Sequence, residues 1–378
     1  LSAAAAVIAS NAQRHEKTLW TEAPPGAPVG LAAYRDERDE AEAVVQDLLA
    51  ARAAGESLSE MAVFYRVNAQ SRALEEALRL YALPYVVVGG TRFFDRMEIR
   101  DLMAYLRLLV NPDSDVDILR VLNVPGRGLG AKSRERLQAA ALEADCSLYR
   151  AMEAKNLGAM RKAERGKVLA FRALIDDMRQ AAQGLPAAEV VRIALRMSGY
   201  AKALDAVGDD EALGRLENLS ELITAAEDVA RATEDESLGA FLEHVAGVAA
   251  GELAEQGAEA VTLMTLHAAK GLEFDRVFMV GLEDGMLPHR RSLGEDFGEG
   301  PGHSLEEERR LCYVGMTRAR KHLQLTLARA RSIFGRTELN PPSRFLGDLP
   351  EELGRGAQPA PPPSLFPGGG SELSRWSS

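Results

Sequence analysis

Two sets of short apolar strand patterns flank a long stretch of purely helical periodicity in this chain. Val29 to Tyr34, Met61 to Tyr65 and Tyr85 to Val88 have the composition of strands, and helices are predicted between them over 36–52 and 71–81. Such alternation of strand and helix is typical of a parallel sheet with crossover helices. The sequence therefore predicts an α/β fold.

The helical stretch extends from about residue 95 to residue 252, and strand patterns return after it. Val261 to Thr265, Arg276 to Val280 and Leu323 to Leu327 are predicted strands, with a helix over 305–319. One α/β domain interrupted by an all-helical insertion explains both sets of strands most simply. We assign residues 1–91 and 257–350 to the α/β domain, 92–256 to the insertion and 351–378 to a tail.

Composition excludes several classes of protein. A length of 378 residues exceeds one ordinary domain, and a net charge of -11 argues against a uniformly basic surface for nucleic acid or membrane. No apolar run is long enough to span a bilayer, so no membrane partner is expected. Cys146 and Cys312 have no clustered partner, which suits a reducing cytoplasm. The six histidines include no HExxH motif, and no metal site is predicted in this chain.

Both ends of the chain have distinctive compositions. Residues 1–12 have helical spacing of apolar residues but no methionine and no basic leader, which predicts a piece of a longer protein. Residues 351–378 contain five prolines and three consecutive glycines. A segment of that composition buries too little apolar surface to fold, so we interpret it as a flexible linker.

Basic residues are concentrated near the C-terminal end of the α/β domain. The window from 309 to 336 contains eight bases and no acid: Arg309, Arg310, Arg318, Arg320, Lys321, Arg329, Arg331 and Arg336. This window predicts an anion-binding edge on an acidic protein. A solvated arginine-rich face is the alternative interpretation.

A glycine cluster over residues 126–131 satisfies the loose GxGxx(G/A) dinucleotide pattern. Its context is unsuitable, because Pro125 precedes it and the neighbouring residues have a helical rather than a strand pattern. The cluster fits better the turn of a helix-hairpin-helix, where free amides around Gly128 and Gly130 can meet a phosphate whatever the base sequence. Arg127 and Lys132 would add charge. A simple turn between two helices is an equally good interpretation.

The most specific motifs lie in the second half of the α/β domain. They are the run from Val261 to Val280, the Leu287-Pro288-His289 loop, and the segment from Glu306 through Thr317 and Arg318 to Arg320. These motifs resemble motifs V and VI of superfamily 1A DNA helicases of the UvrD/PcrA/Rep family. The resemblance extends upstream to the segments 63–78, 88–94 and 125–130, and covers roughly residues 1–350.

The resemblance implies the C-terminal half of such an enzyme: a RecA-like domain, which is a P-loop NTPase fold without its own P-loop, carrying a mobile helical insertion. The insertion would swivel at joints near residues 91–95 and 253–258. In the family, ATP lies between two RecA-like domains and single-stranded DNA crosses the top of both. A bacterial cytoplasmic location is implied as well.

Three residues match the family's nucleotide site. Arg318 resembles an arginine finger that reaches the γ-phosphate, since developing charge on phosphoryl oxygens is best met by an always-ionised planar fork. Glu273 resembles the carboxylate that binds the ribose hydroxyls, and the Gly271 region would close over the phosphates. Without the resemblance, Glu273 reads equally well as a solvated acid at the start of a helix.

Other residues match positions that contact DNA in the family. Thr265, His267 and Lys270 match the segment that couples the nucleotide cleft to DNA. The family pattern assigns the single-stranded DNA track to Asn68, Arg92, His289 and Phe334, where stacking platforms lie beside cations. By the same resemblance the glycine turn with Arg127, Gly128, Gly130 and Lys132 would contact duplex DNA at a single-strand/duplex junction.

The P-loop lysine and the acids that hold magnesium are missing from these 378 residues. The resemblance therefore implies an ATP-dependent 3′ to 5′ DNA helicase or translocase of DNA repair. Its ATP and Mg²⁺ would be held mainly by an N-terminal RecA-like half, and this chain alone would be inactive. The alternative is a DNA-binding and interaction module, with repair or transcription proteins recruited by the tail.

Overall fold

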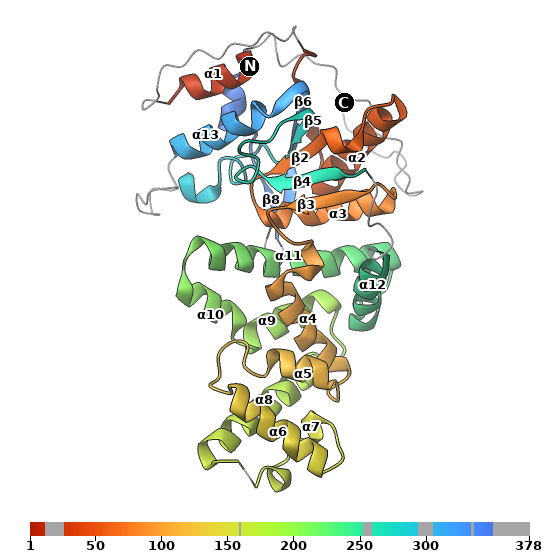
Figure 1. Cartoon of the computed structure of the whole chain (residues 1–378), viewed down its shortest axis with the longest axis vertical. Coiled ribbons are helices and arrows are strands. Elements are labelled where there is room, and N and C mark those ends of the chain that lie inside the picture. The colour runs from red at the N-terminus through yellow and green to blue at the C-terminus, as the bar shows by residue number, and fades with distance from the viewer. Residues whose placement is uncertain (12–25, 159, 252–258, 294–304, 334–335, 351–378) are drawn as a thin grey trace, which may run out of the picture.

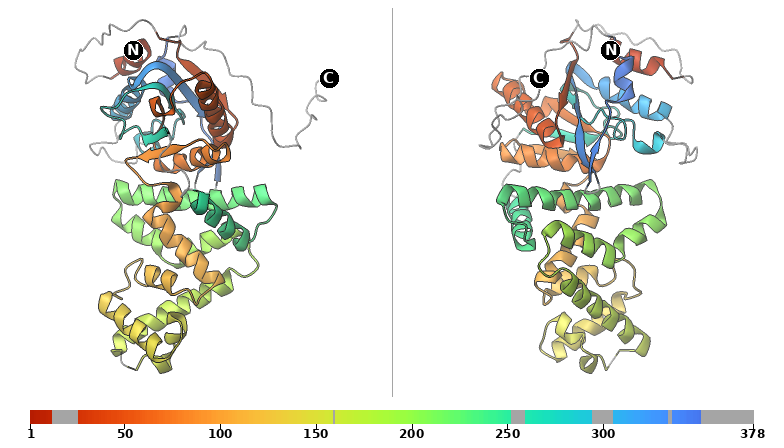
Figure 2. Two further views of the ribbon diagram at one scale, coloured as in Figure 1. Left: turned by 45° about the vertical axis from the view of Figure 1, so that its right-hand side comes forward. Right: turned by 180° about the vertical axis from the view of Figure 1, so that it is seen from behind.

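The structure is a computed structural model that describes residues 1–11, 26–158, 160–251, 259–293, 305–333 and 336–350. Figure 1 shows a sheet-containing part above a long helical part, and Figure 2 shows the same division from two further directions. The expected tail and the expected domain boundary at residue 256 lie outside the described residues. Within the described ranges, no helix combines the length and the apolar character needed to cross a membrane.

Six parallel strands form the central sheet. They are β1 (Gly30–Tyr34), β2 (Met61–Tyr65), β3 (Tyr85–Val88), β4 (Val261–Thr265), β5 (Phe274–Met279) and β6 (Ala319–Ala328). Their order in space is β1-β6-β5-β2-β4-β3, and every neighbouring pair is parallel. The strands after the insertion therefore complete the sheet that the first three begin. This confirms the predicted α/β domain with its helical interruption.

Helices cover both faces of the sheet, as the surroundings of strand β2 show. All five of its residues are buried, and successive side chains of a strand point to opposite faces. Met61, Val63 and Tyr65 pack in one apolar cluster, which α2 and α3 cover, while Ala62 and Phe64 pack in another, which α1 and α13 cover. A continuous apolar run is what a strand in such a position requires. The covering helices are α1 (Ser2–Ala9), α2 (Glu37–Ala53), α3 (Ser71–Leu80) and α13 (Leu305–Met316).

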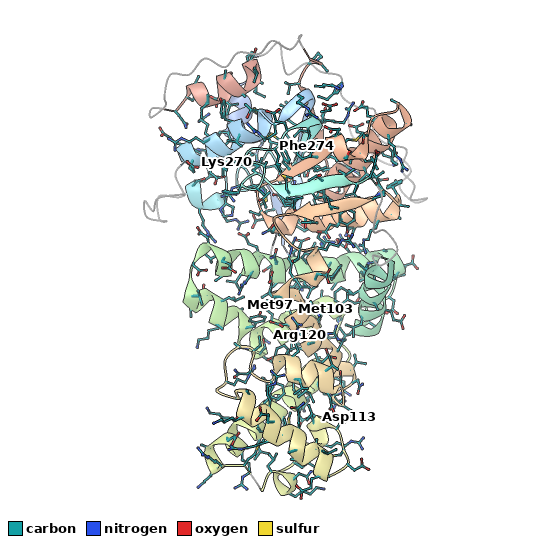
Figure 3. The ribbon with its side chains drawn as sticks, in the orientation of Figure 1. Met97, Met103, Asp113, Arg120, Lys270 and Phe274 are labelled. Carbon is teal, nitrogen blue, oxygen red and sulfur yellow. The ribbon has the colours of Figure 1, made fainter. Side chains whose placement is uncertain are left out.

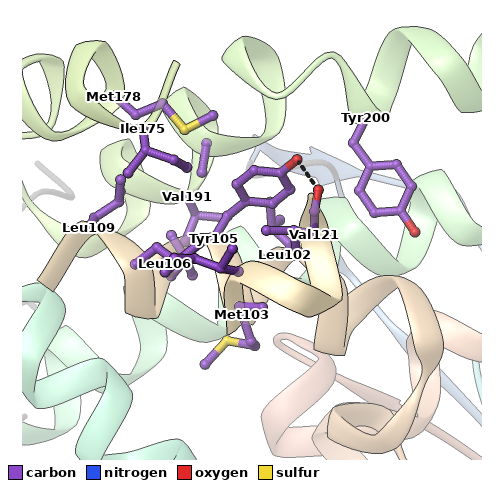
Figure 4. Packing of buried hydrophobic residues seen from close by; sticks show 14 of the residues in the cluster. Leu102, Met103, Tyr105, Leu106, Leu109, Val121, Ile175, Met178, Val191 and Tyr200 are labelled. Carbon is purple, nitrogen blue, oxygen red and sulfur yellow. Dashed lines mark hydrogen bonds between the residues drawn. The ribbon is translucent and has the colours of Figure 1, made fainter. Parts of the chain in front are cut away.

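The insertion is helical throughout its described residues and has its own core. Its helices are α4 (Met97–Val110), α5 (Asp115–Val121), α6 (Ala131–Glu143), α7 (Leu148–Ala151), α8 (Lys162–Ala181), α9 (Ala187–Met197), α10 (Tyr200–Val207), α11 (Asp210–Thr233) and α12 (Leu238–Gly251). Helix α4 runs through the centre, where Leu102, Tyr105 and Leu106 pack against residues of α8 and α9 (Figure 4). The hydroxyl of Tyr105 donates to the carbonyl of Val121 at 3.3 Å. The separate core is consistent with an insertion that folds as a unit.

One feature of the sheet domain is absent from the sequence prediction. Strands β7 (Ala330–Ile333) and β8 (Arg336–Leu339) form an antiparallel hairpin next to the end of β6. The hairpin extends toward the insertion, and β7 contacts α11 (Figure 1). Its strands are four residues each, and the arginines within them conceal the period-two pattern that identifies a strand.

Candidate functional site

The parallel sheet has two edges with different candidate residues. Because all strands run the same way, their carboxyl ends meet at one edge and their amino ends at the opposite edge. Glu273 and Arg318 immediately precede β5 and β6, and so lie at the amino edge. Asn68 follows β2 and His267 follows β4, at the carboxyl edge. The predicted nucleotide and DNA residues are thus separated across the sheet.

At the amino edge the structure brings the nucleotide candidates together. One terminal nitrogen of Arg318 donates to the carbonyl of Leu272 at 3.2 Å, and the amide of Phe274 donates to the carbonyl of Arg318 at 2.9 Å. These two bonds place Arg318 against the loop that carries Gly271 and Glu273, both of which are exposed. Gly271 has a φ of +87°, a backbone conformation that glycine adopts without strain.

The guanidinium of Arg318 is held by uncharged groups. Its Nε donates to the carbonyl of Val314 at 3.0 Å, and its second terminal nitrogen donates to Oγ1 of Thr317 at 2.9 Å. Among the described residues no carboxylate pairs with it. The positive charge is therefore oriented but not neutralised, which suits a group that meets an anion.

The segment that joins the two edges runs from Thr265 to Glu273. Leu266 and Ala269 are buried, while His267 and Lys270 are exposed. Lys270 lies in the sheet domain close to Phe274, far from Met97 and Arg120 of the insertion (Figure 3). The hydroxyl of Thr265 accepts from the amide of Ala268 at 3.3 Å, which fixes the turn after β4.

Helix α13 packs closely on this connecting segment. Gly315 makes that approach possible, since a Cβ at this position would lie 2.5 Å from Cδ2 of Leu266 and 3.0 Å from Cε of Met279. A larger side chain would require the side chain of Leu266, or the helix itself, to shift. The helix that leads to Arg318 and the segment that carries His267 are therefore in direct contact.

The four candidates for the single-stranded DNA track differ in accessibility. Asn68 is exposed at the start of a 3-10 turn (Asn68–Gln70), and Arg92 is half-buried with its guanidinium 5.0 Å from the ring centre of Tyr85. His289 is only 6% exposed, and its Nε2 lies 3.3 Å from Oε1 of Glu217 in α11. Phe334 lies outside the described residues. In this conformation α11 covers His289.

Helix α11 faces the sheet domain with a row of acids. Asp210, Glu217, Glu221 and Asp228 are spaced by seven, four and seven residues, so at about 100° per residue they fall within about 40° of one another around the helix. Asp210 pairs with Arg291 at 3.0 Å, and Glu221 and Asp228 pair with the buried Arg72 at 2.5 and 2.8 Å. Burial raises the pKa of Glu221 to about 7, although Arg72 opposes the rise.

The glycine turn of the insertion uses Arg127 internally. Its terminal nitrogens donate to four backbone carbonyls at 2.8–3.2 Å, and its guanidinium lies over the ring of Phe171 at 5.4 Å. The acceptors are Val121, Val124, Pro125 and Ser198. These acceptors are uncharged, so they orient the guanidinium without neutralising it, and the contact of Arg127 with duplex DNA stays a prediction. Its partners are the carbonyl of the last residue of α5 and three carbonyls that follow α5 or α9.

The remaining turn residues are open to solvent. Gly128 and Gly130 are exposed, Gly130 precedes the first residue of α6, and Lys132 is exposed on the first turn of that helix. Lys167 of α8 is a neighbour that the sequence did not indicate, with its Nζ 3.4 Å from the carbonyl of Gly128. The two lysines are 35 residues apart in the chain, so only the tertiary structure places both at this turn.

Comparison with known proteins identifies the family. Residues 1–330 match the UvrD-like helicase C-terminal domain. The chain belongs to this family. It is 40% identical over 355 residues to the ATP-dependent DNA helicase PcrA of Staphylococcus epidermidis, and 40% identical over 360 residues to the protein of the same name in Bacillus subtilis. Each alignment covers 93% of this chain and 48% of the relative. The chain thus spans about half the length of the curated relatives it matches.

Within this UvrD-like domain the basic window is largely paired. Among the side chains that the structure describes, five bases of the window form ion pairs with acids outside it: Arg309, Arg310, Arg320, Lys321 and Arg331. Arg309 and Arg331 are buried, so the expected anion-binding edge does not include them. The window appears unpaired in sequence because its acidic partners come from other segments, such as Glu40 and Asp348.

The position of Arg127 in the UvrD-like domain leads to a stability prediction. Arg127→Met should lower the free energy of unfolding by about 1–3 kcal/mol, because buried carbonyls lose their donor. Arg134→Met on the exposed face of α6 is the matched control and should change it by less than about 0.5 kcal/mol. Urea unfolding followed by circular dichroism measures both. Equal midpoints for the two variants would contradict the internal role of Arg127.

Proposed function

We propose that this chain is the C-terminal half of an ATP-dependent DNA helicase or translocase that moves 3′ to 5′ and acts in DNA repair. The observation that carries the proposal is the oriented, unneutralised guanidinium of Arg318 beside the exposed loop of Gly271 and Glu273. Arg318 would stabilise negative charge on the transferred γ-phosphoryl group, and Glu273 would bind the ribose hydroxyls.

ATP hydrolysis at the amino edge would need a second domain to bind the metal ion. Glu273 is the only acid in the exposed loop 270–273, and magnesium prefers several oxygen ligands, so Mg²⁺ would be held mainly by an N-terminal RecA-like half. Bound there, the ion would neutralise phosphate charge. Arg318 would approach the same phosphates from the opposite side of the cleft, as an arginine finger does.

The opposite edge of the sheet supplies part of the DNA track. Asn68, which is exposed, and Arg92, which is half-buried, would contact a single strand, and His289 would join them once α11 no longer covers it. Thr265, His267 and Lys270 lie on the segment between the two edges and would couple them. Duplex DNA at the junction would meet the amides of Gly128 and Gly130 together with Lys132.

The protein would act in a bacterial cytoplasm. The partners that this function implies are single-stranded DNA, the single-strand/duplex junction and the N-terminal half. The Pro/Gly-rich residues 351–378 would recruit repair or transcription proteins, since a flexible linker binds partners without a fixed fold of its own.

ATP hydrolysis tests the proposal directly. The purified chain with Mg²⁺ and saturating single-stranded DNA should show no turnover, because it has no P-loop. Addition of the N-terminal RecA-like half of the same enzyme in trans should produce turnover that DNA stimulates. Hydrolysis by the chain alone, or silence of the combined halves under conditions where they associate, would contradict the proposal.

A further inference from the structure

Glu308 is a buried carboxylate that lies beside the end of β2, and no sequence motif distinguishes it from its neighbours. It lies on the first turn of α13 and is 1% exposed. Its oxygens accept from Nε of Arg66 at 3.0 and 3.1 Å and from a terminal nitrogen of Arg66 at 2.6 Å. One oxygen also accepts from the backbone amide of His289 at 3.0 Å. A single side chain thus holds two separate loops.

Both loops belong to the proposed DNA track. Arg66 directly follows β2 and precedes Asn68 by two residues. The turn around Asn68 is closed by Gln70, whose Oε1 accepts from the amides of Arg66 and Val67, each at 3.0 Å. Moving Arg66 therefore moves Asn68 with it. The bond from Glu308 to the amide of His289 fixes the second loop in the same way.

The helix that carries Glu308 leads to the opposite edge of the sheet. Arg318 follows the end of α13 and is held by the carbonyl of Val314 in the last turn of that helix. Gly315 packs α13 against Leu266 in the segment that carries His267. A shift of α13 would consequently move Arg318 and the connecting segment. Through Glu308 it would also move both DNA loops.

The electrostatic environment of Glu308 keeps its contacts with Arg66 and the amide of His289 intact at neutral pH. Burial alone would raise the pKa of Glu308, but the hydrogen bonds from Arg66 and from the amide of His289 outweigh it and keep the pKa below its usual range. An ionised carboxylate with a guanidinium partner makes shorter and stronger hydrogen bonds than a neutral pair. The connection between α13 and the loops is therefore stiff at neutral pH.

We propose that Glu308 is a positioning residue that transmits DNA binding at the Asn68 and His289 loops to Arg318 through α13. It touches neither nucleotide nor DNA, and acts only by keeping the two loops and the helix in one geometry. The inference rests on the proposed function. A purely structural role would instead affect folding, or lower every activity to the same extent.

The test uses this chain combined with the N-terminal half and compares Glu308→Gln with the wild type. The Glu308→Gln variant should keep its DNA-free ATP turnover but lose about tenfold of the stimulation by single-stranded DNA, a size typical of coupling between two sites. A second measurement is the single-stranded DNA affinity with and without a non-hydrolysable ATP analogue. The ratio of the two affinities should approach one in the variant.

Two further variants control the experiment. Glu307→Gln removes a carboxylate from the same helix that is 41% exposed and pairs with Arg310, so it should leave the stimulation unchanged. Arg66→Gln combined with Glu308→Gln removes both charges, so no buried charge is left unpaired. The double variant should lose the stimulation as the single variant does.

Each outcome decides the inference. DNA stimulation that stays intact in Glu308→Gln and in the double variant overturns it while leaving the proposed function in place. Equal loss of DNA-free and DNA-stimulated turnover, or failure of both variants to fold by circular dichroism, assigns Glu308 a structural role and also overturns it. Absence of ATP hydrolysis by the associated wild-type halves overturns the proposed function and the inference with it.

Discussion

Arg318→Ala in the combined halves should lower ATP turnover by about a thousandfold or more, while single-stranded DNA affinity stays largely unchanged. The guanidinium acts on charge that develops in the transition state, so its loss affects the chemical step rather than ground-state binding. The backbone of Arg318 bonds to Phe274 whatever the side chain, which keeps the start of β6 in place. Steady-state ATPase rates and fluorescence anisotropy with a labelled oligonucleotide measure the two effects.

Arg320→Ala is the matched control for this experiment. Arg320 lies two residues further along the chain and pairs with Asp275 at 2.8 Å and with Glu60, with its side chain 44% exposed. An exposed ion pair contributes little, about 0–1 kcal/mol, so this variant should retain turnover. Normal hydrolysis by Arg318→Ala with impaired DNA binding would remove Arg318 from the nucleotide site.

Arg331→Met should lower the free energy of unfolding by about 3–5 kcal/mol, because it leaves two carboxylates buried without their cation. Arg331 donates to Glu283 at 2.7 and 2.9 Å and to Glu40 at 2.7 Å, and all three residues are buried. Glu40 also accepts from the amide of Gly281 and the hydroxyl of Thr326. The cluster thereby ties β7 to α2 and to the ends of β5 and β6.

Arg329→Met separates this effect from a general loss of basic charge. Arg329 is exposed two residues earlier, and its replacement should change stability by less than about 0.5 kcal/mol. Urea unfolding of both variants measures the difference. A midpoint for Arg331→Met equal to that of Arg329→Met would show that the buried cluster contributes no net stability.

Local patterns were sufficient for the fold of the sheet domain. The five consecutive apolar residues of β2 need burial on both faces, and that requirement alone indicates a central strand of a parallel sheet. The other five strands were located from shorter apolar or alternating patterns, because such a pattern and its flanking turns lie within a few residues of each other. The hairpin β7–β8 was missed because its strands are short and include Arg331, which only the tertiary structure pairs with buried acids.

Contiguous motifs likewise located the candidate nucleotide residues. Gly271, Glu273 and Arg318 belong to two motifs that adjacent strands bring to one edge, so their proximity follows from the order of the sheet. The accessibility of the candidate DNA-binding residues could not be predicted from the sequence. His289 looks like a polar loop residue in the sequence, yet Glu217 of the insertion covers it.

The sequence by itself determined the parallel sheet, the helical insertion and the family, since each depends on residues close together along the chain. The tertiary structure alone decided which distant groups hold the buried and half-buried charges. Arg127 binds backbone carbonyls, Arg331 binds Glu40 and Glu283, and Glu308 holds Arg66. With 45 bases and 56 acids, any base has many acids of equal chemistry available. Attraction between charges on distant segments has no sequence period, so only the packing of those segments selects the pair.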